Sequence, residues 1–538
     1  MKKRKEPVYG ESAQGMVSTA SRVATEAGSI MLEKGGNAVD AAVASAFCLG
    51  VTEPQASGLG GQTMALIYLK EKQRVFVLDG SSRAPYRIQP HKTPEKPLKL
   101  GLQASTIPST PATLGYMQEQ YGKLSLSEVL EPAIEAAEKG FRVSSLQHRL
   151  IHKEADWMRK DDSIFEHYFQ EGKPAAAGSL IKQPELATTL SRMAKVGWED
   201  FYLGEIGKKI VEDMVQRNGL ISQTDLSQIP LPVEREVLTS SYREYTLHTF
   251  PPPGAGRVLV QLMNILENFP SEQLNPETPE GAVLFALAFR MTLSDRQKMP
   301  IHPDYFSQIT NRVMSDKSYA KEVAEKIHYL MHQNPRINYA PPPTSGETTH
   351  LSVADQEGNA VGITQSIELV FGSKTMAKGL GFFYNNYMSA FEYKDVTHPY
   401  YLLPGGRPWS SVAPTLMMKE NTPHYILGSP GSERISTSLA QVITRLVDEK
   451  KHLSEAIAAP RLHVSHTGRL QIELERFDEE VIHALKELRF SITKRGPYSF
   501  YLGCVQGVAM PQKSETLFCG VADPRRDGSA KGPERKGD

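Results

Sequence analysis

The strongest constraint on this chain is a proline-rich break that is followed at once by a β-hairpin. Residues 334–347 contain four prolines, three of them consecutive. Because proline removes a backbone donor and disrupts both helices and central strands, this stretch predicts an extended, exposed linker. Residues 348–355 and 360–367 then alternate in polarity around the turn Gln356-Glu357-Gly358-Asn359. We therefore expect Thr348 to begin a strand directly after an exposed segment.

The rest of the chain mixes helical and strand patterns. Residues 37–50 predict a buried helix of small residues, with Asn37 as its N-cap and Gly50 as its C-terminal stop. Other helices are expected within 109–240 and at 257–268, 282–295 and 435–447, and strands at 64–69, 74–78, 424–428 and within 499–521. Since no second linker or internal repeat divides the sequence, we expect one compact unit of mixed α/β structure.

The charge balance and the cysteines exclude several classes of partner. The 538 residues carry 61 Lys and Arg against 61 Asp and Glu, with a pI near 7.3 and no long basic run. We therefore expect neither a nucleic-acid nor a membrane-surface partner. Three scattered cysteines exclude a disulfide scaffold, and no metal site or organic cofactor is expected.

The N-terminal sequence bears on where the protein works. It begins Met1-Lys2-Lys3-Arg4-Lys5, but no apolar stretch of a signal peptide follows, and no window of the chain is apolar enough to span a bilayer. A cytoplasmic location is the expectation, and export by another route is left open.

Thr348 is the main candidate for a nucleophile. The sequence contains no G-x-S-x-G elbow, no H-E-x-x-H pair and no phosphate-binding P-loop. Cleavage between Glu347 and Thr348 would leave an α-amine beside the threonine hydroxyl. Such an amine has a pKa of about 7.7–8.0, so it can serve as the general base that a hydroxyl nucleophile requires.

Ordered motifs along most of the chain resemble those of the γ-glutamyltranspeptidase family of N-terminal nucleophile hydrolases. The resemblance extends over roughly residues 14–530. The segments that carry it include Lys34-Gly35-Gly36-Asn37-Ala38-Val39-Asp40, Ser57-Gly58-Leu59-Gly60-Gly61, Thr348-Thr349-His350, Asn385-Asn386-x-Met388, Gly428-Ser429-Pro430-Gly431 and Asp523-Pro524-Arg525-Arg526.

The resemblance implies a fold and a division of the chain. The fold would be α/β (α+β), a four-layer αββα sandwich that cuts itself between Glu347 and Thr348. Residues 1–347 would form a large subunit and residues 348–538 a small one, which together make one compact unit. Each subunit would thus be the other's partner.

The resemblance also assigns catalytic roles. Thr348 corresponds to the nucleophile, and Ser366 stands where the family has a second threonine that hydrogen-bonds it. The backbone N–H groups of Gly431 and Ser432 match the oxyanion hole. Ser432 replaces a glycine, which is compatible with this role if its φ stays negative.

Substrate binding is assigned in the same way, but with departures from the family. Ser410 and Ser411 match the pair that binds the substrate α-carboxylate, and Tyr387 is a further candidate for substrate contact. Ala390 stands where the family's ammonium-binding Asp is expected, and Glu368, in place of an asparagine, could supply the missing negative charge. Arg83 lies two positions after the family's carboxylate-binding Arg, a variant that resembles the branch with poly-γ-glutamate depolymerases.

Three neighbouring features have simpler interpretations. His350 is expected to be structural, because alternation turns it away from Thr348. Arg434 is expected to brace the glycine-rich loop, and Arg525 and Arg526 to form solvated salt bridges rather than an anion site.

The resemblance favours a self-processing γ-glutamyl hydrolase/transpeptidase that acts on a small molecule, glutathione or a γ-glutamyl peptide. Only 15 residues separate Phe391 from Arg407, which predicts a site without the family's lid loop and hydrolysis favoured over transfer. One alternative is an acylase or poly-γ-glutamate depolymerase that cleaves a different amide, such as a glutaryl side chain. A second alternative is an uncleaved, inert homologue that acts as a binding protein.

Overall fold

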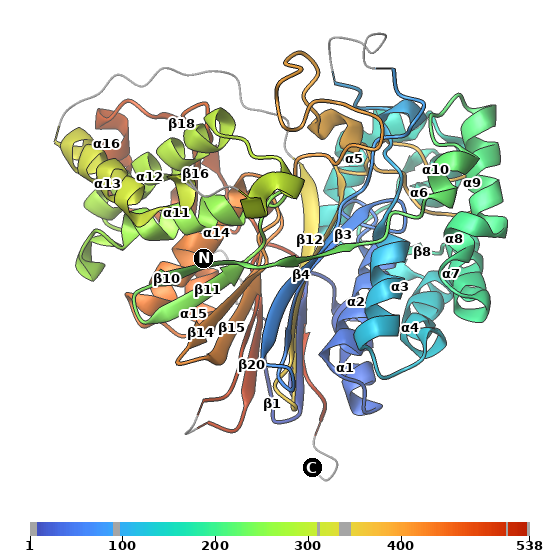
Figure 1. Ribbon diagram of the computed structural model, residues 1–538, viewed down its shortest axis with the longest axis horizontal. Helices are drawn as coiled ribbons and strands as arrows, with labels where there is room; N and C mark the ends of the chain where they lie inside the picture. Colours follow the sequence, from blue (N-terminus) through green and yellow to red (C-terminus); the bar gives the residue numbers. More distant parts are fainter. Residues whose placement is uncertain (1–7, 90–96, 309–312, 333–345, 513–514, 535–538) are drawn as a thin grey trace.

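The structure is a computed structural model that describes residues 8–89, 97–308, 313–332, 346–512 and 515–534. Most of the predicted linker, up to residue 345, lies outside the described residues. Two seven-stranded antiparallel sheets pack face to face, and a layer of helices covers the outer face of each (Figure 1). The predicted four-layer αββα sandwich is therefore confirmed.

The first sheet contains the predicted hairpin at its centre. Its strands, in spatial order, are β21 (Ser529–Lys531), β2 (Gly15–Thr19), β12 (Glu347–Asp355), β13 (Ala360–Glu368), β3 (Gln62–Leu69), β4 (Arg74–Gly80) and β9 (Val233–Glu236). The second sheet runs β1 (Val8–Ser12), β20 (Phe518–Ala522), β19 (Gln506–Ala509), β15 (Thr422–Gly428), β14 (Thr415–Lys419), β11 (Tyr245–Thr249) and β10 (Leu238–Tyr242).

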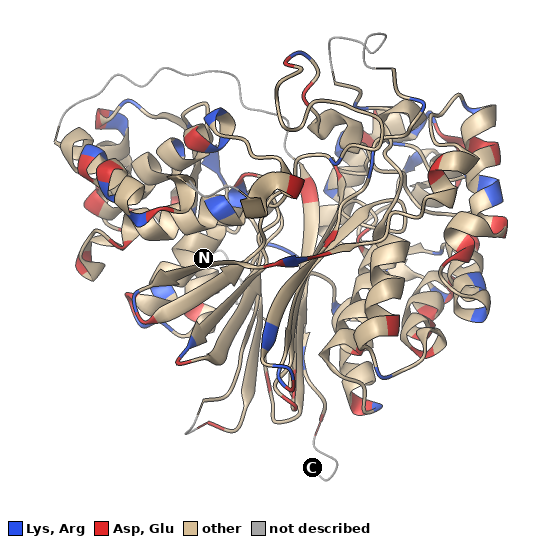
Figure 2. Cartoon of the chain, viewed as in Figure 1, with Lys and Arg blue, Asp and Glu red and all other residues tan. Residues whose placement is uncertain are grey.

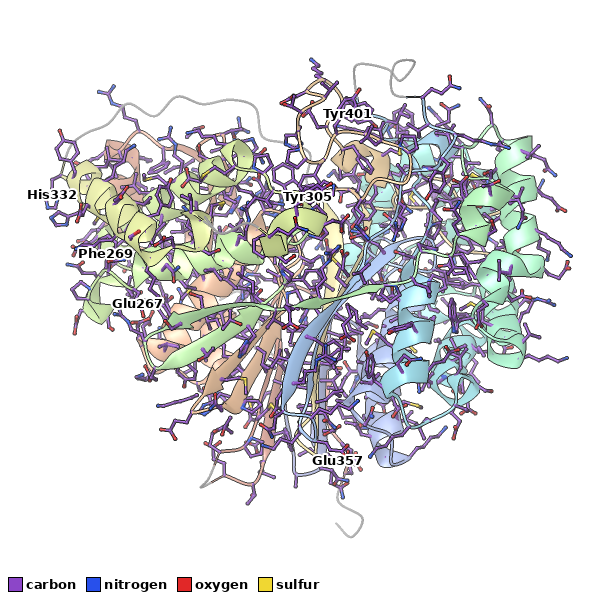
Figure 3. All side chains as sticks on the ribbon, in the orientation of Figure 1. Glu267, Phe269, Tyr305, His332, Glu357 and Tyr401 are labelled. Atoms are coloured by element: carbon purple, nitrogen blue, oxygen red, sulfur yellow. The ribbon has the colours of Figure 1, made fainter. Side chains whose placement is uncertain are left out.

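The hairpin of β12 and β13 places Thr348 at one end of the sandwich. β12 begins at Glu347, one residue earlier than the alternation predicts, and pairs with β13 in the register Leu351↔Ile363. Glu357, in the turn between the two strands, lies at the lower end of the molecule (Figure 3). The start of β12 therefore lies at the opposite end, between the two helical layers (Figure 1).

Ten helices of the described chain lie on the side of the first sheet, and six lie on the side of the second. The first group is α1 (Arg22–Glu33), α2 (Ala38–Thr52), α3 (Thr110–Tyr121), α4 (Leu126–Lys139), α5 (Ser145–Met158), α6 (Asp162–Tyr168), α7 (Pro184–Val196), α8 (Asp200–Leu203), α9 (Glu205–Gln216) and α10 (Gln223–Ser227). The second group is α11 (Gly256–Leu266), α12 (Pro279–Lys298), α13 (Lys317–Met331), α14 (Arg434–Val447), α15 (Leu453–Ala458) and α16 (Glu479–Glu487).

Helix α2 shows how local sequence sets these elements. Asn37 caps it as predicted, since its side chain accepts from the N–H groups of Val39 and Asp40, and the Asp40 carboxylate accepts from the Asn37 N–H in return. The predicted stop at Gly50 is wrong, because the helix continues through Thr52 and Glu53 is its C-cap. Residues with small side chains keep α2 closely packed, and every residue of the helix except Gly50 is buried.

Three apolar clusters fill the spaces between the four layers. One joins the first sheet to its helices, for example Val353 and Ile363 with Phe47, and a second joins the other sheet to α11, α12 and α14. The third lies between the sheets and includes Met64 and Ile426. Burying each large apolar side chain stabilises the folded state by about 1.5–3 kcal/mol. The two packed sheets therefore hold the residues at their ends in fixed positions.

Charged side chains lie mostly on the outer helices and at strand ends, with both signs interspersed (Figure 2). Among the described residues, no helix is both long and apolar enough to cross a bilayer. Within the same residues, no group of three or more His, Cys, Asp or Glu side chains is placed to hold a metal ion.

Candidate active site

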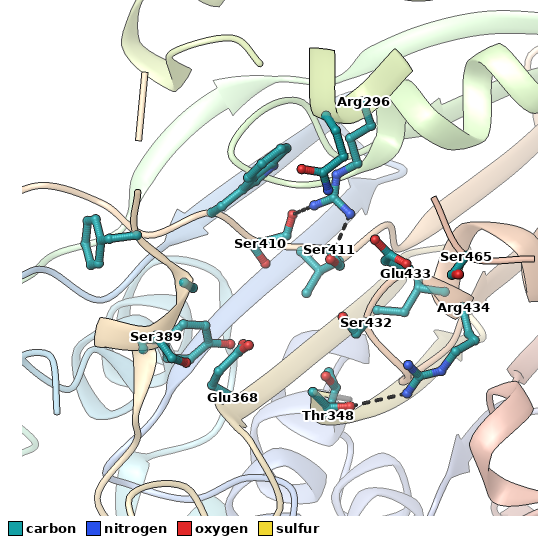
Figure 4. Close-up of a pocket in the computed structure, with 18 of the residues that line it drawn as sticks. Arg296, Thr348, Glu368, Ser389, Ser410, Ser411, Ser432, Glu433, Arg434 and Ser465 are labelled. Atoms are coloured by element: carbon teal, nitrogen blue, oxygen red, sulfur yellow. Dashed lines mark hydrogen bonds between the residues drawn. The ribbon is translucent and has the colours of Figure 1, made fainter. Parts of the chain in front are cut away.

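A cavity of about 390 Å³ lies at the start of β12. It brings together residues from distant parts of the sequence, from Arg296 to Tyr501. Six of the predicted site residues line it: Thr348, Glu368, Tyr387, Ser410, Ser411 and Ser432. Figure 4 shows the serine pair between Arg296, at one side of the cavity, and Thr348. Thr348 is only 5% exposed, so the hydroxyl works in a restricted environment.

The peptide bond between Glu347 and Thr348 is held by Ser366. The Ser366 hydroxyl donates to the carbonyl oxygen of Glu347 at 2.7 Å, and it accepts from the backbone N–H of Glu368 at 2.9 Å. The strand pairing shifts register between Glu347 and Thr349, which sets this peptide apart from the regular ladder. A donor on a carbonyl oxygen draws electron density from the carbon, so this contact favours attack on the Glu347 carbonyl.

Below this peptide lies a buried ion cluster that the sequence did not reveal. Arg526 pairs with the carboxylates of both Glu347 and Glu53, and Glu53 also accepts from the Thr349 hydroxyl at 2.5 Å. Burial raises the pKa of Glu53 and lowers that of Arg526, because it outweighs the attraction between the two groups.

The expectation of solvated salt bridges at Arg525 and Arg526 is therefore wrong in one respect. Both form ion pairs, but both are buried, at 3% and 6% exposure. Arg525 is held by Glu473 at 2.7 Å and by Asp523 at 3.1 Å. Neither arginine lines the cavity at Thr348.

The predicted oxyanion donors lie in a turn just before helix α14. Neither the Gly431 nor the Ser432 amide N–H donates to an acceptor within the described residues. The turn precedes a helix N-terminus, where backbone N–H groups and the helix dipole favour negative charge. Ser432 lines the cavity with Thr348, and Gly431 does not, so stabilisation of an oxyanion by the two amides stays a prediction.

The condition attached to Ser432 is not met. Its φ is +54°, in the left-handed region that favours glycine, and Gly431 has φ +122°. A non-glycine residue held there stores about 1–3 kcal/mol of strain. The turn thus holds Ser432 in a glycine-like conformation, so the condition under which serine was compatible with the oxyanion role is absent.

Arg296, from the last turn of α12, is a cavity residue that sequence reasoning missed. It donates to the Ser411 hydroxyl at 3.0 Å and to the Ser410 carbonyl oxygen at 2.7 Å, as the dashed lines in Figure 4 mark. Its guanidinium also lies over the ring of Trp409, 4.8 Å from the centroid. The predicted helix at 282–295 stopped one residue before it, and a single arginine in a helix carries no motif.

Glu368 supplies a carboxylate on another wall. Burial raises the pKa of Glu368 to about 7, although the charge of Arg296 partly opposes this rise. The residue is the last of β13, and its φ of +78° turns the chain there. Ala390 lines the cavity without a charge, and burial keeps the Tyr387 phenol protonated by raising its pKa.

Arg83 is not among the residues that line the cavity. Its backbone carbonyl accepts from the Ile107 N–H at 2.8 Å, and burial, together with the charge of Arg407, lowers the pKa of Arg83. Binding of substrate by Arg83 stays a prediction without geometric support.

His350 has structural contacts, as expected, whereas Arg434 contacts segments outside the glycine-rich turn and also lines the cavity, so its expected role stays a prediction. Arg434 donates to the carbonyl oxygens of Tyr501 at 2.8 Å and Gly346 at 3.4 Å, and it lies over the Tyr501 ring. His350 is fully buried between the hydroxyls of Thr364 and Ser352, where burial lowers its pKa to about 3. A Cβ at Gly428 would clash with the His350 ring, which explains a glycine at that position.

Comparisons with known proteins agree with the geometry. The sequence model of the family described as gamma-glutamyltranspeptidase matches residues 24–532. The glutathione hydrolase proenzyme of Escherichia coli (strain K12) is 33% identical over 473 residues, which cover 84% of this chain and 81% of that protein. The acylase ACY 1 proenzyme of Pseudomonas sp. (strain SE83) is 33% identical over 500 residues, 89% of this chain and 87% of its own. The crystal structure of cephalosporin acylase from Bacillus halodurans superposes with a TM-score of 0.89 at 27% identity, covering 99% of this chain and 98% of that one.

Proposed function

The chain belongs to the γ-glutamyltranspeptidase family of N-terminal nucleophile hydrolases, and we propose that it is a self-processing hydrolase that cleaves γ-glutamyl amides through an acyl-enzyme on Thr348. The class of hydrolase follows from the family and its acylase relatives. The observation that carries the proposal is the position of Thr348, the second residue of a central strand, which lines the cavity together with the serine pair and Ser432.

The proposed reaction has two parts that use the same groups. In processing, the Thr348 hydroxyl attacks the Glu347 carbonyl, whose oxygen Ser366 polarises at 2.7 Å. Hydrolysis of the resulting ester frees the α-amine of Thr348. In turnover, that amine accepts the hydroxyl proton as the oxygen attacks the γ-carbonyl of the donor, and the proton passes to the departing amine. Water, or an acceptor amine, then releases the acyl group.

One carboxylate and a pair of hydroxyls in the cavity suit a γ-glutamyl donor. Its α-ammonium would face Glu368, which takes the place of the family's aspartate, and its α-carboxylate would face the hydroxyls of Ser410 and Ser411. The segment between Phe391 and Arg407 contributes Glu392 and His398 to the cavity wall. A favoured hydrolysis, as against transfer, is part of this proposal.

An acylase is the second candidate, and one observation favours it. Ala390 leaves one wall of the cavity uncharged, and the structure superposes over nearly its whole length on a protein described as a cephalosporin acylase. On this proposal the acyl group would be a dicarboxylic monoacyl group such as glutaryl, which lacks the ammonium.

The experiment is p-nitroaniline release from γ-glutamyl- and glutaryl-p-nitroanilide, with Thr348→Ala and Thr348→Ser as variants. We expect release from the γ-glutamyl donor by the wild type, a slower release by Thr348→Ser and none by Thr348→Ala. Release from the glutaryl donor alone would move the assignment to an acylase. No release from either donor would contradict both candidates and favour an inert homologue.

A further inference from the structure

Among the described residues, Arg296 is a buried cation that no carboxylate contacts directly. Its side chain is 6% exposed, and within the described residues it forms no ion pair with a carboxylate. A guanidinium carries five N–H donors, and the contacts of Arg296 are two neutral oxygens and one aromatic face. Taking a charge out of water without a partner is costly, so such a group is expected where an anion arrives from outside the protein.

The acidic residues near Arg296 either pair with another residue or lie on another wall of the cavity. Glu433 pairs with His466 at 2.7 Å, and this contact and the charge of Arg296 keep the pKa of Glu433 below its ordinary value despite burial. Glu368 influences Arg296 only through space, without direct contact. Two other charged groups of the cavity wall are held by the backbone: Arg434 donates to the carbonyl oxygens of Tyr501 and Gly346, and Glu392 accepts from the Lys394 N–H. Arg296 and Glu368 therefore lie in the same cavity without pairing directly.

The position of Arg296 fits the far end of an acyl chain that starts at Thr348. The serine pair lies between the two residues in Figure 4, and Arg296 holds both serines, one by its hydroxyl and one by its carbonyl oxygen. A flat guanidinium can bind a carboxylate with two parallel hydrogen bonds, and the ring of Trp409 fixes its plane. Arg83, by contrast, does not line the cavity.

We propose that Arg296, and not Arg83, is the residue that selects acyl donors whose far end is a carboxylate, so that γ-glutamyl and glutaryl amides are both accepted. This inference rests on the proposed function and names the substrate class of the same site. It separates two features of the donor: the carboxylate is recognised by Arg296, and the ammonium is recognised independently by Glu368.

Four p-nitroanilides isolate the two charges of the donor. The γ-glutamyl donor carries the carboxylate and the ammonium, the glutaryl donor only the carboxylate, the 4-aminobutyryl donor only the ammonium, and the butyryl donor neither. The measured quantity is the kcat/KM of each donor relative to butyryl. This ratio cancels any general damage to Thr348 or to the loop that carries Ser410 and Ser411.

For Arg296→Met, the glutaryl-to-butyryl ratio is expected to fall by about 10- to 150-fold, the range for loss of a charged hydrogen-bonded contact. The 4-aminobutyryl-to-butyryl ratio should not fall. Arg296→Lys keeps the charge and should retain part of the preference, which also covers the case in which Arg296→Met does not fold. Arg290→Ala, on the same helix but outside this cavity, is the matched control.

Two results would overturn the inference. One is an equal loss for all four donors in both Arg296 variants, which would make the arginine a support for the serine loop and no more. The other is loss of the carboxylate preference in Arg83→Ala while the Arg296 variants keep it.

A failure of the proposed function gives a different signature. If the wild type cleaves none of the four donors, calorimetry with glutaramate and butyramide, which differ only by the carboxylate, still tests the inference. Glutaramate binding at least tenfold tighter than butyramide, with the difference lost in Arg296→Met, would support it. Equal binding of the two amides by the wild type would contradict it.

Discussion

The ionisation of Glu368 should decide which of two donors the enzyme prefers. With a pKa of about 7, the carboxyl group is about one-tenth ionised at pH 6 and about nine-tenths ionised at pH 8. Only the ionised form attracts the ammonium of a γ-glutamyl donor, whereas a glutaryl donor places an uncharged methylene there. The ratio of kcat/KM for γ-glutamyl over glutaryl-p-nitroanilide should therefore rise from pH 6 to pH 8, by up to about tenfold.

The ratio is measured in one buffer series, so that the α-amine of Thr348 and any other group that both donors share cancel out. In Glu368→Gln the ratio should be low and constant with pH. An ionised carboxylate contributes about 1.5–3 kcal/mol to a hydrogen bond with a cation, so the γ-glutamyl preference at pH 8 should fall by about 10- to 150-fold in this variant. A flat ratio in the wild type, or an unchanged slope in Glu368→Gln, would refute the reasoning.

Three further predictions concern stability and the turn at Ser432. The pKa of Glu368 is raised in the folded state, so its contribution to stability is present below about pH 4.5 and is lost as pH rises through about 7. Glu368→Gln should therefore raise the free energy of unfolding at pH 8 by roughly 1–3 kcal/mol and leave it unchanged at pH 4. Thermal melts at the two pH values would measure this. Arg526→Met removes the partner of Glu53 and Glu347 and should lower the free energy of unfolding by about 3–5 kcal/mol, measured by urea unfolding of the uncleaved Thr348→Ala chain. Lys531→Met breaks an exposed pair with Glu26 and should cost under about 1 kcal/mol. Equal losses in the two variants would contradict the argument that the buried pair is the stronger one. Ser432→Gly suits a φ of +54° and should keep kcat. Ser432→Val should lower kcat by about 10²-fold or more, because a β-branched residue displaces the amide. Similar rates in the two variants would argue against an oxyanion role.

Much of the fold could be predicted from sequence because local patterns carry it. The alternation after the prolines gave β12 and β13, and Asn37 identified the start of α2. The end of α2 was missed because a glycine in a tightly packed helix is not a stop when the following residues remain buried. Arg525 and Arg526 were expected at the surface, since their partners, Glu473, Glu53 and Glu347, are far away in sequence and only the folded chain brings them together.

In the site, too, residues within sequence motifs could be predicted, and residues whose role depends on distant contacts could not. Residues inside ordered motifs, such as Thr348, Ser410 and Ser411, were identified before the structure, and the cavity brings them together. Arg296 was missed because its importance comes from the loop it touches, 114 and 115 residues further along the chain. The positive φ of Ser432 could not be predicted for a related reason, since the conformation of the backbone there is set by the turn and not by the side chain.

The most direct test of the central claim is the intact mass of the purified protein, with sequencing of any new N-terminus. If Thr348 is an N-terminal nucleophile, the wild-type chain of 59.7 kDa should be found as two associated fragments of 347 and 191 residues out of 538, the second beginning at Thr348. Thr348→Ala should stay as one chain. A single wild-type chain, or a fragment that begins at another residue, would contradict the assignment of Thr348.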